Sequence, residues 1–321
     1  MSMAAPTDRQ AQALARLAPG ATAATPLPAV AMPMHMGLDA LVTPVDGTGA
    51  ALIVKTYLPG ALAPFTFGTA AEAAARAGEL GIAPALTGTD ATMQTLLFER
   101  LGEGWRMASV ADLLSEDRLS EDWLSAVVAA LRTWHGSAPL TSSVSPLELF
   151  RAHLATAEAC PLPVLPATLR MDLAGLTQWV ERIAGALDAA GSAKVPLHGE
   201  ILASNLMLGP DGQVRLLDFD RATMGDPFRD LAALSLEACV DDEDRARLVT
   251  LYTGQPASAA DMARLKLLGM LEDACWALWA LIGETVPERR GPELYKYATN
   301  RLIRFRLCLS SYDMARLLRE V

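Results

Sequence analysis

Acidic and amide side chains recur at short spacing around residue 200. His198, Glu200 and Asn205 follow the pattern His-x-acid-x-x-x-x-Asn, and Asp218 comes thirteen residues after Asn205, at the end of an apolar run. Transfer of a phosphoryl group needs an acidic group near the attacking hydroxyl and oxygen ligands for Mg²⁺. Glu200, Asn205 and Asp218 supply both, so the spacing predicts phosphoryl-transfer chemistry if a loop and the hairpin behind it bring them into one cavity.

A second pair of charges lies upstream. Lys55 is on the apolar segment 51–57, and Glu72 is on the helix-forming segment 69–80. An ion pair between the two would place the lysine against nucleotide phosphates. Two alternatives stay open: Lys55 as an ordinary strand-edge lysine, and Glu79 as a rival partner near the helix end.

Hydrophobic patterns predict the elements that must hold these side chains. A short helix over 7–17 and a proline-rich arm over 18–33 come first. A hairpin of strands 39–45 and 51–57, the helix 69–80 ending at Gly81, and the strand 95–98 follow. Beyond residue 105, helical periodicity appears over 108–114, 121–135, 146–159 and 167–190. A hairpin over 205–217 precedes helices from Asp230 to the end.

This order predicts an α+β protein with two lobes, a small N-terminal antiparallel-sheet lobe and a larger, mainly helical C-terminal lobe. The expected boundaries are 1–30 for an N-terminal arm or short helix, 31–99 for a nucleotide-binding lobe, and 100–321 for a catalytic and acceptor-binding lobe. A cleft between two lobes is a common ligand site.

Further motifs resemble a known group, the aminoglycoside phosphotransferase and choline kinase superfamily, a branch of the protein-kinase-like fold. Residues 224–232, MGDPFRDLA, are similar to its GDP-x-x-D-L-A element, and residues 131–140, LRTWHGSAPL, resemble its L-x-x-L-H-x-x-P helix end. Residues 81–84 resemble the turn after its N-lobe helix, and 98–101 resemble its hinge. The order and spacing match over roughly residues 35–300.

The resemblance implies a two-lobed protein-kinase-like fold and a set of roles around ATP and Mg²⁺. Lys55 would contact the nucleotide phosphates, with Glu72 orienting it, and Asn205 and Asp218 would bind Mg²⁺. Glu200 stands at the position of the catalytic Asp. The hinge residues that would meet adenine include Phe98, Glu99 and Leu101. His198 would support the loop, Asp230 would tie it to the following helix, and Asp220 is either a second metal ligand or a helper.

Two departures from the family pattern stand out. HGE replaces the usual HGD, which adds one C–C bond, about 1.5 Å of reach, and a misplacement of about 1 Å can cost about 100-fold in rate. A Gly-rich phosphate-covering loop is also missing, because Gly47 and Gly49 suit the hairpin turn better. The covering loop is expected near Met34–Gly37.

The segment 271–279 is the candidate acceptor site. Trp276 and Trp279 are three residues apart on one helix face and could box a quaternary ammonium by cation–π attraction, with Glu272 or Asp273 adding charge. The alternative is that both tryptophans belong to the core. Residues 241–244 suit a solvated helix start, and Arg301–Arg306 suit a solvated helix face.

Composition excludes several classes of protein. Hydrophobic residues make up 51% of the 321, which is too many for a disordered chain. The chain has no run of about 18 apolar residues for a membrane span and no signal-peptide pattern. A formal charge of −10 disfavours nucleic acid as a partner. Four widely separated cysteines indicate reduced thiols and a cytoplasmic location.

The predicted function is therefore a Mg²⁺-dependent kinase that transfers the γ-phosphate of ATP, or of GTP, to a hydroxyl of a small molecule. The acceptor classes considered are a sugar, an amino sugar, a choline-like compound and an amino alcohol; the oligomeric state stays open. A nucleotide-binding pseudokinase that acts as a regulator is the alternative suggested by Glu200, although the retained Lys55, Glu72, Asn205 and Asp218 oppose it. Transfer of a nucleotidyl group is a third possibility.

Overall fold

The computed structural model describes residues 5–27, 39–114, 118–165, 173–286 and 292–321. Its internal contacts divide the chain into two units. Unit 1 consists of residues 1–142 and 196–224, and unit 2 of residues 143–195 and 225–321. The expected phosphate-covering loop at 34–37 lies outside the described residues.

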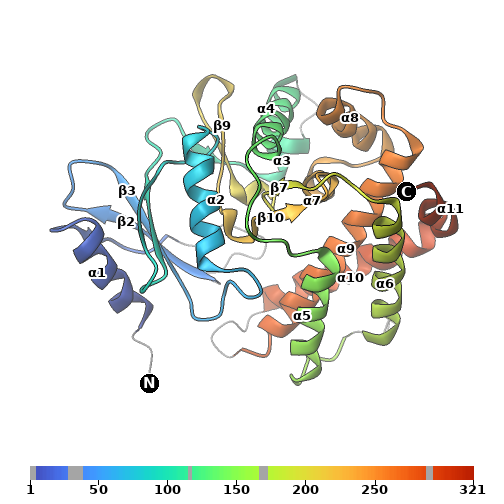
Figure 1. Cartoon of the computed structure of the whole chain (residues 1–321), viewed down its shortest axis with the longest axis horizontal. Coiled ribbons are helices and arrows are strands. Elements are labelled where there is room, and N and C mark those ends of the chain that lie inside the picture. The colour runs from blue at the N-terminus through green and yellow to red at the C-terminus, as the bar shows by residue number, and fades with distance from the viewer. Residues whose placement is uncertain (1–4, 28–38, 115–117, 166–172, 287–291) are drawn as a thin grey trace. The chain divides into compact units, whose positions relative to one another are not determined.

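Unit 1 is built on a five-stranded antiparallel sheet with the strand order β1-β2-β3-β5-β4. Figure 1 shows β2 and β3 of this sheet. The strands are β1 (Thr22–Ala23), β2 (Ala40–Asp46), β3 (Leu52–Tyr57), β4 (Leu86–Asp90) and β5 (Thr95–Glu99). In this register Lys55 of β3 lies opposite Val42 of β2 and Leu96 of β5. Lys55 is therefore held by a central strand, whose backbone is paired on both sides.

Helices cover both faces of this sheet. Leu14 of α1 (Pro6–Leu17) packs in one cluster with Val54 and Leu97, and α2 (Phe67–Glu79) packs its buried alanines in another cluster with Tyr57 (Figure 1). Successive side chains of a strand point to opposite faces. Lys55 and Tyr57 therefore both lie on the α2 side.

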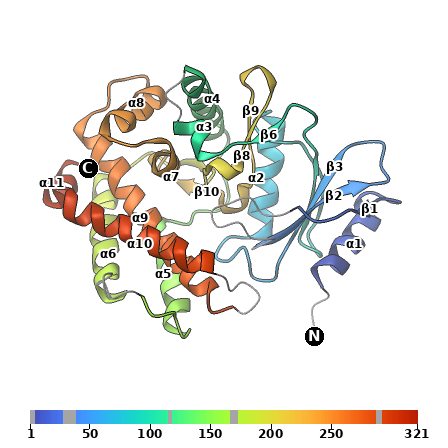
Figure 2. The same ribbon diagram turned by 180° about the vertical axis from the view of Figure 1, so that it is seen from behind.

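The rest of unit 1 surrounds the loops of residues 198–222. Its elements are β6 (Arg106–Met107), α3 (Val110–Leu114), α4 (Arg118–His135), β7 (Val195–Leu197), β8 (Leu206–Leu208), β9 (Val214–Leu216) and β10 (Thr223–Gly225). Strands β6, β8 and β9 form one sheet (Figure 2). Strand β7 pairs with β10. Trp134 of α4 is fully buried and meets the ring of Phe219 edge-on at 4.9 Å between centroids. This contact anchors the loop after β9.

Unit 2 is helical. It contains α5 (Pro146–Glu158), α6 (Leu173–Ala190), α7 (Phe228–Ala238), α8 (Asp242–Thr253), α9 (Ala259–Gly283), α10 (Pro292–Ser311) and α11 (Met314–Glu320). The 25-residue α9 packs against α5, α7 and α10. A helix contacted on several sides is buried nearly all round, which is why α9 is apolar along most of its length. No helix in the described part of the chain is long and apolar enough to cross a bilayer.

The α+β class predicted from the sequence is confirmed, with the antiparallel sheet toward the N-terminus and helices dominating the remainder. The contact-based units differ from the lobes expected at 31–99 and 100–321, because residues 100–142 and 196–224 group with the sheet. The physical reason is a set of hydrogen bonds that join the loop at 218–221 to β3 and to Asp39. Such long-range pairings cannot be read from local patterns.

Candidate active site

The loop after β7 depends on one glycine. Gly199 has φ +85°, a backbone conformation that side chains with a Cβ rarely adopt. A Cβ at this position would lie 2.3 Å from the carbonyl oxygen of Arg221. Gly199 thus lets the segment that carries Glu200 lie directly against the segment that carries Arg221.

His198 holds this loop from inside. It is completely buried, its Nε2 is 2.8 Å from the carbonyl oxygen of Leu217, and its ring lies 4.5 Å from that of Phe219. The backbone N–H of Glu200 lies 3.3 Å from Nδ1, so both ring nitrogens of His198 have polar partners in this loop. These bonds support the structural role predicted for His198.

Asn205 joins the loop to the hairpin. Its Nδ2 donates to the backbone carbonyl oxygen of Glu200 at 2.9 Å, and the backbone carbonyl of Asn205 accepts from the N–H of Leu217 at 2.8 Å. The side-chain oxygen Oδ1 of Asn205 remains available as an acceptor. Asp218 follows Leu217 with φ +68° and ψ +63°, a left-handed conformation that is uncommon outside glycine. Strained residues of this kind cluster at functional sites.

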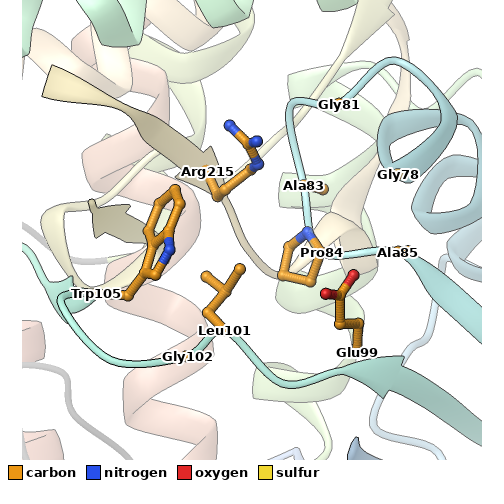
Figure 3. Close-up of a pocket in the computed structure, with 10 residues that line it drawn as sticks. All are labelled: Gly78, Gly81, Ala83, Pro84, Ala85, Glu99, Leu101, Gly102, Trp105 and Arg215. Carbon is orange, nitrogen blue, oxygen red and sulfur yellow. The ribbon is translucent and has the colours of Figure 1, made fainter. Parts of the chain in front are cut away.

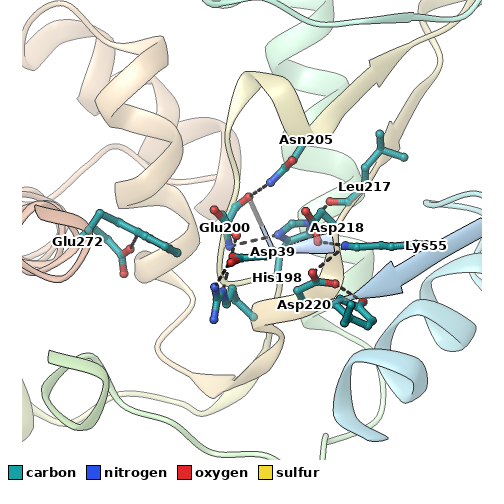
Figure 4. A network of polar contacts seen from close by, with 12 residues as sticks. Asp39, Lys55, His198, Glu200, Asn205, Leu217, Asp218, Asp220 and Glu272 are labelled. Carbon is teal, nitrogen blue, oxygen red and sulfur yellow. Dashed lines mark hydrogen bonds and ion pairs between the residues drawn. The ribbon is translucent and has the colours of Figure 1, made fainter. Parts of the chain in front are cut away.

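Lys55 meets two carboxylates of this loop (Figure 4). Its Nζ lies 2.6 Å from Asp218 Oδ1 and 2.7 Å from Asp220 Oδ2. The hydroxyl of Tyr57 donates to Asp220 Oδ1 at 2.5 Å. The structure therefore brings together the four predicted residues Lys55, Glu200, Asn205 and Asp218, all within unit 1.

The charges of this group shift one another's pKa. Burial alone lowers the pKa of Lys55, but the carboxylates of Asp218 and Asp220 outweigh burial and raise it well above its ordinary value. Burial likewise opposes ionisation of Asp218, yet the ammonium of Lys55 holds its pKa below the ordinary value. Burial and the charge of Asp218 raise the pKa of Asp220 to about 7. Lys55 and Asp218 are thus a fixed ion pair, with Asp220 the more weakly ionised partner.

Glu200 lies beside the same group. Its side chain is 22% exposed, and Oε2 is 4.0 Å from Nε of Arg221. Burial raises the pKa of Glu200 to about 8; the charge of Arg221 opposes this shift, and that of Asp218 adds to it. In its ionised form, a carboxyl group with a raised pKa is a stronger base than an ordinary carboxylate.

The predicted ion pair between Lys55 and Glu72 is wrong for the described residues. Glu72 accepts from Nη2 of Arg76 at 2.7 Å and from the hydroxyl of Thr141 at 3.1 Å. Arg76 is one helical turn away on α2, so the carboxylate of Glu72 has a counter-charge on its own helix. Lys55 extends from β3 to the carboxylates of Asp218 and Asp220 instead. The spacing along the sequence allowed both partners.

Asn205 and Asp218 fit a magnesium site by the chemistry of their donors. Mg²⁺ takes oxygen ligands, commonly one or two from the protein, with water and substrate phosphates completing the set. The described residues contain no group of three or more His, Cys, Asp or Glu side chains that could hold a metal by themselves. The protein oxygens here match a site that nucleotide phosphates complete.

The predicted hinge borders a cavity of about 310 Å³ in unit 1 (Figure 3). Glu99 and Leu101 line this cavity together with Pro84, Trp105 and Arg215. Phe98 is partly buried and packs instead against the cluster around Tyr57. The role of Phe98, Glu99 and Leu101 toward adenine stays a prediction.

The acidic residues of α9 are placed otherwise than predicted. Glu272 is an ion-pair partner of Arg229, with 2.7 Å between Oε1 and Nε, and both side chains are at most 3% exposed. Asp273 is 1% exposed and pairs with Arg301 at 3.1 Å and with Arg304 at 2.7 Å. Direct contact of either acid with a cationic acceptor is therefore corrected to a structural role. Arg301 and Arg304 are likewise corrected from a solvated helix face to partners of Asp273.

The two tryptophans of α9 form an edge-to-face pair. Their ring centroids are 5.6 Å apart, and Nε1 of Trp276 donates to Glu272 Oε2 at 2.8 Å. Trp276 is 6% exposed, whereas Trp279 is half-buried. Trp276 therefore belongs to the core and Trp279 lies at its margin. Binding of a quaternary ammonium by the two rings stays a prediction.

The start of α8 and the four cysteines can also be compared with the sequence predictions. Asp241 is the N-cap of α8 and accepts from the N–H groups of Glu243 and Asp244, as a helix start requires. The four cysteines are free thiols. Both predictions are confirmed.

The buried Arg229–Glu272 pair leads to a stability prediction. Glu272→Ala leaves the Arg229 guanidinium buried without its counter-charge, so we expect the free energy of unfolding to fall by ~3–5 kcal/mol. Urea denaturation followed by circular dichroism measures the change. The control is Glu320→Ala, which removes the exposed pair with Arg316 and should cost ~1 kcal/mol or less. Equal losses in the two variants would contradict a special role for the buried pair.

A sequence model described as the phosphotransferase enzyme family matches residues 30–268. The chain belongs to this family. The match spans strands β2 to β5 of the sheet of unit 1 and the loop with Glu200, Asn205 and Asp218. The resemblance that the motifs indicated is thereby confirmed. No curated protein matches the chain significantly by sequence.

Solved structures of phosphotransferases share the fold. A choline/ethanolamine kinase family protein from Mesorhizobium loti aligns with TM-score 0.76 and 19% identity over 98% of this chain and 99% of its own. Choline kinase LicA from Streptococcus pneumoniae aligns with TM-score 0.72 and 19% identity over 94% and 97%. Macrolide 2'-phosphotransferase MphH from Brachybacterium faecium aligns with TM-score 0.56 and 16% identity over 92% and 97%. The kinase-like fold predicted for this phosphotransferase is confirmed.

Sequence reasoning missed several members of the polar group, namely Asp39, Tyr57 and Arg221, and left Asp220 undecided. One signal was present for Tyr57, because positions 55 and 57 of a strand share a face. Arg221 and Asp39 are 182 residues apart, yet 3.0 Å separates Nη2 from Oδ2. No local pattern in the sequence marks such a pair.

Proposed function

We propose that this phosphotransferase transfers the γ-phosphoryl group of ATP, with Mg²⁺, to the hydroxyl of a small amino alcohol of the choline or ethanolamine class. The observation that carries the catalytic part is the convergence of Lys55 on Asp218 at 2.6 Å, with Asn205 bonded to the backbone of Glu200. Cation, metal-ligand oxygens and proton acceptor are thus within one unit of the fold.

Each side chain has a chemical task in this proposal. The ammonium of Lys55 binds the nucleotide phosphates, and its tie to Asp218 fixes its position. Glu200 orients the acceptor hydroxyl and takes its proton as the oxygen bonds to the γ-phosphorus. The bond from that phosphorus to the bridging oxygen breaks, and ADP leaves with the electron pair.

Asn205 and Asp218 would hold Mg²⁺, which when bound neutralises charge on the phosphates. LicA, which shares the fold, has also been solved in complex with AMP, and this supports an adenine nucleotide as donor here. Tyr57 and Asp220 keep Lys55 from turning away, since both contact it within unit 1.

Two observations support the choice of acceptor class. Trp279 presents a half-buried indole edge-on to Trp276, and quaternary ammonium groups bind tryptophan faces. Among the similar structures, a choline/ethanolamine kinase family protein and LicA align with the higher TM-scores of those compared. Glu272 fixes the indole of Trp276 by accepting a hydrogen bond from its N–H.

A panel of hydroxyl compounds tests the function. We expect ADP release with Mg²⁺ and ATP to depend on choline, ethanolamine or a related amino alcohol, and the product to gain the mass of one phosphate. Amino sugars and macrolides serve as the competing acceptors. A product that gains AMP would contradict phosphoryl transfer and support nucleotidyl transfer.

The Glu at position 200 favours one second candidate, a nucleotide-binding regulator without turnover. The retained Lys55, Asn205 and Asp218 oppose it, because loss of catalysis usually does not leave all the phosphate and metal ligands in place. Tight binding of ATP and Mg²⁺ in calorimetry, with no ADP formed from any acceptor, would favour the regulator.

Trp279 gives the acceptor class its own prediction. In Trp279→Ala the loss of one aromatic face should raise the KM for the cationic acceptor about 3- to 30-fold, the equivalent of ~0.5–2 kcal/mol, with the KM for ATP unchanged. Trp279→Phe keeps a π face and should lose less. Trp179→Ala is the matched control, because Trp179 is also half-buried in unit 2 and stacks on Arg182. An unchanged KM in Trp279→Ala would contradict the cation box.

A further inference from the structure

In unit 1 the backbone at Gly199, next to Glu200, packs directly against the backbone of Arg221. The carbonyl oxygen of Arg221 occupies the space where any Cβ at Gly199 would lie. Arg221 ends the short 3-10 turn Phe219–Arg221 that follows the left-handed Asp218. The turn therefore places Arg221 at a defined position beside Glu200, the neighbour of Gly199.

The side chain of Arg221 is itself held on several sides. It is 5% exposed, its Nη2 lies 3.0 Å from Oδ2 of Asp39, and its guanidinium carbon lies 5.5 Å from the ring centre of Phe65. Asp39 precedes β2, and Phe65 precedes α2. Such an arginine has little rotamer freedom, so its charge is fixed in space.

This fixed charge faces Glu200, with 4.0 Å between Nε and Oε2. The carboxylates of Asp218, Asp39 and Asp220 repel an ionised Glu200, whereas the guanidinium of Arg221 attracts it. Arg221 therefore offsets part of this repulsion. Its attraction opposes a rotation of Glu200 away from the site.

We propose that Arg221 is a positioning residue that holds the carboxylate of Glu200 in place for transfer. This inference rests on the proposed function and deepens it. A Glu at this position has one more rotatable bond than an Asp, hence more conformations in which the carboxylate is misplaced. The Arg221 guanidinium, which is held by Asp39, disfavours these misplaced conformations of Glu200. The longer side chain can then act at the position where the family resemblance implies a catalytic Asp.

The test uses the full chain with Mg²⁺, ATP and the acceptor found in the panel. Arg221→Met removes the charge and keeps much of the volume, and we expect kcat to fall about 10- to 100-fold, with the KM for ATP unchanged. Arg221→Lys keeps a charge and should recover part of the loss. Arg106→Met is the matched control, because Arg106 forms an exposed pair with Asp112 in unit 1, and its kcat should equal that of the wild type.

A thermal-unfolding cycle tests the contact without relying on turnover. Arg221→Met, Glu200→Gln and the double variant are melted at high pH, where the carboxylate is ionised. The drop in Tm caused by Arg221→Met should be smaller by about 2 °C or more in the Gln background, because Arg221 then has one carboxylate fewer to hold.

Three results would overturn the proposal: an unchanged kcat in Arg221→Met, a raised KM for ATP with kcat intact, or equal drops in Tm in both backgrounds. The second result would make Arg221 a nucleotide ligand instead. If the wild type transfers phosphate to no acceptor, the proposed function fails, and the unfolding cycle still decides whether Arg221 holds Glu200.

Discussion

Glu200→Gln should lower kcat for phosphoryl transfer by ~10²–10⁴-fold, the usual contribution of a positioned general base. The amide keeps the size of the side chain but cannot accept the proton of the acceptor hydroxyl. Binding of ATP should persist, because Lys55, Asn205 and Asp218 are unchanged. Steady-state kinetics with a coupled ADP assay, together with calorimetric titration of ATP, measures both.

Glu200→Asp is the matched comparison. It retains the proton acceptor and shortens the side chain by about 1.5 Å, so its turnover should stay above that of the Gln variant. If Gln and wild type turn over equally, Glu200 is not the proton acceptor. If no variant shows turnover while all bind ATP, the regulator described above is favoured.

The same Glu200→Gln substitution should stabilise the ligand-free protein at alkaline pH. The pKa of Glu200 is raised from its ordinary 4.5 to about 8 by burial, against the pull of Arg221. The folded protein therefore keeps a proton that the unfolded chain releases, and this contribution to stability is full below 4.5 and lost as the pH rises through about 8. Glutamine never ionises, so the stability advantage of the variant should grow from about pH 5 to about pH 9 and reach at most ~5 kcal/mol. Thermal melts across this range measure it, and a constant difference would contradict the raised pKa.

Lys55→Met should both abolish transfer and destabilise the fold. The lysine is 11% exposed and sits between two carboxylates, so its removal leaves Asp218 and Asp220 facing each other without a cation. Breaking a buried ion pair in this way costs ~3–5 kcal/mol. Urea denaturation measures the loss, and the ADP assay measures turnover in whatever fraction folds.

Two further variants make the result on Lys55 decisive. Lys55→Met combined with Asp220→Asn removes one of the two repelling charges and should regain part of the lost stability. Lys266→Met breaks a pair with the exposed Asp242 and should cost ~1 kcal/mol or less. If Lys55→Met behaves like Lys266→Met, the buried contact with Asp218 does not hold the site together.

Much of the fold could be predicted because its signals are local. The helix predicted at 69–80 is α2, and the strands predicted at 39–45 and 51–57 are β2 and β3. Periodicity and turn residues act within a few positions, so one sequence carries them. The short motifs around Glu200, Asn205 and Asp218 were found for the same reason, since a loop and the adjacent hairpin are close in the chain as well as in space.

The choice of partners for charged groups could not be predicted in this way. Lys55 had several acids at plausible distance along the chain and pairs with Asp218 and Asp220, while Glu72 pairs with Arg76. Glu272 looked available to a cationic ligand until the fold placed Arg229 against it. An ion pair depends on distances of a few ångströms, which spacing along the chain does not constrain.

The sequence alone therefore determined three features: the order of elements, the family motifs and the identity of the residues that carry the chemistry. Each of these depends on residues that are neighbours along the chain. The anchoring of Arg221 on Asp39, the neutralisation of the acids in α9 and the raised pKa of Glu200 emerged from folding. The physical reason is that burial and Coulomb interactions depend on which distant segments come to lie within a few ångströms of one another.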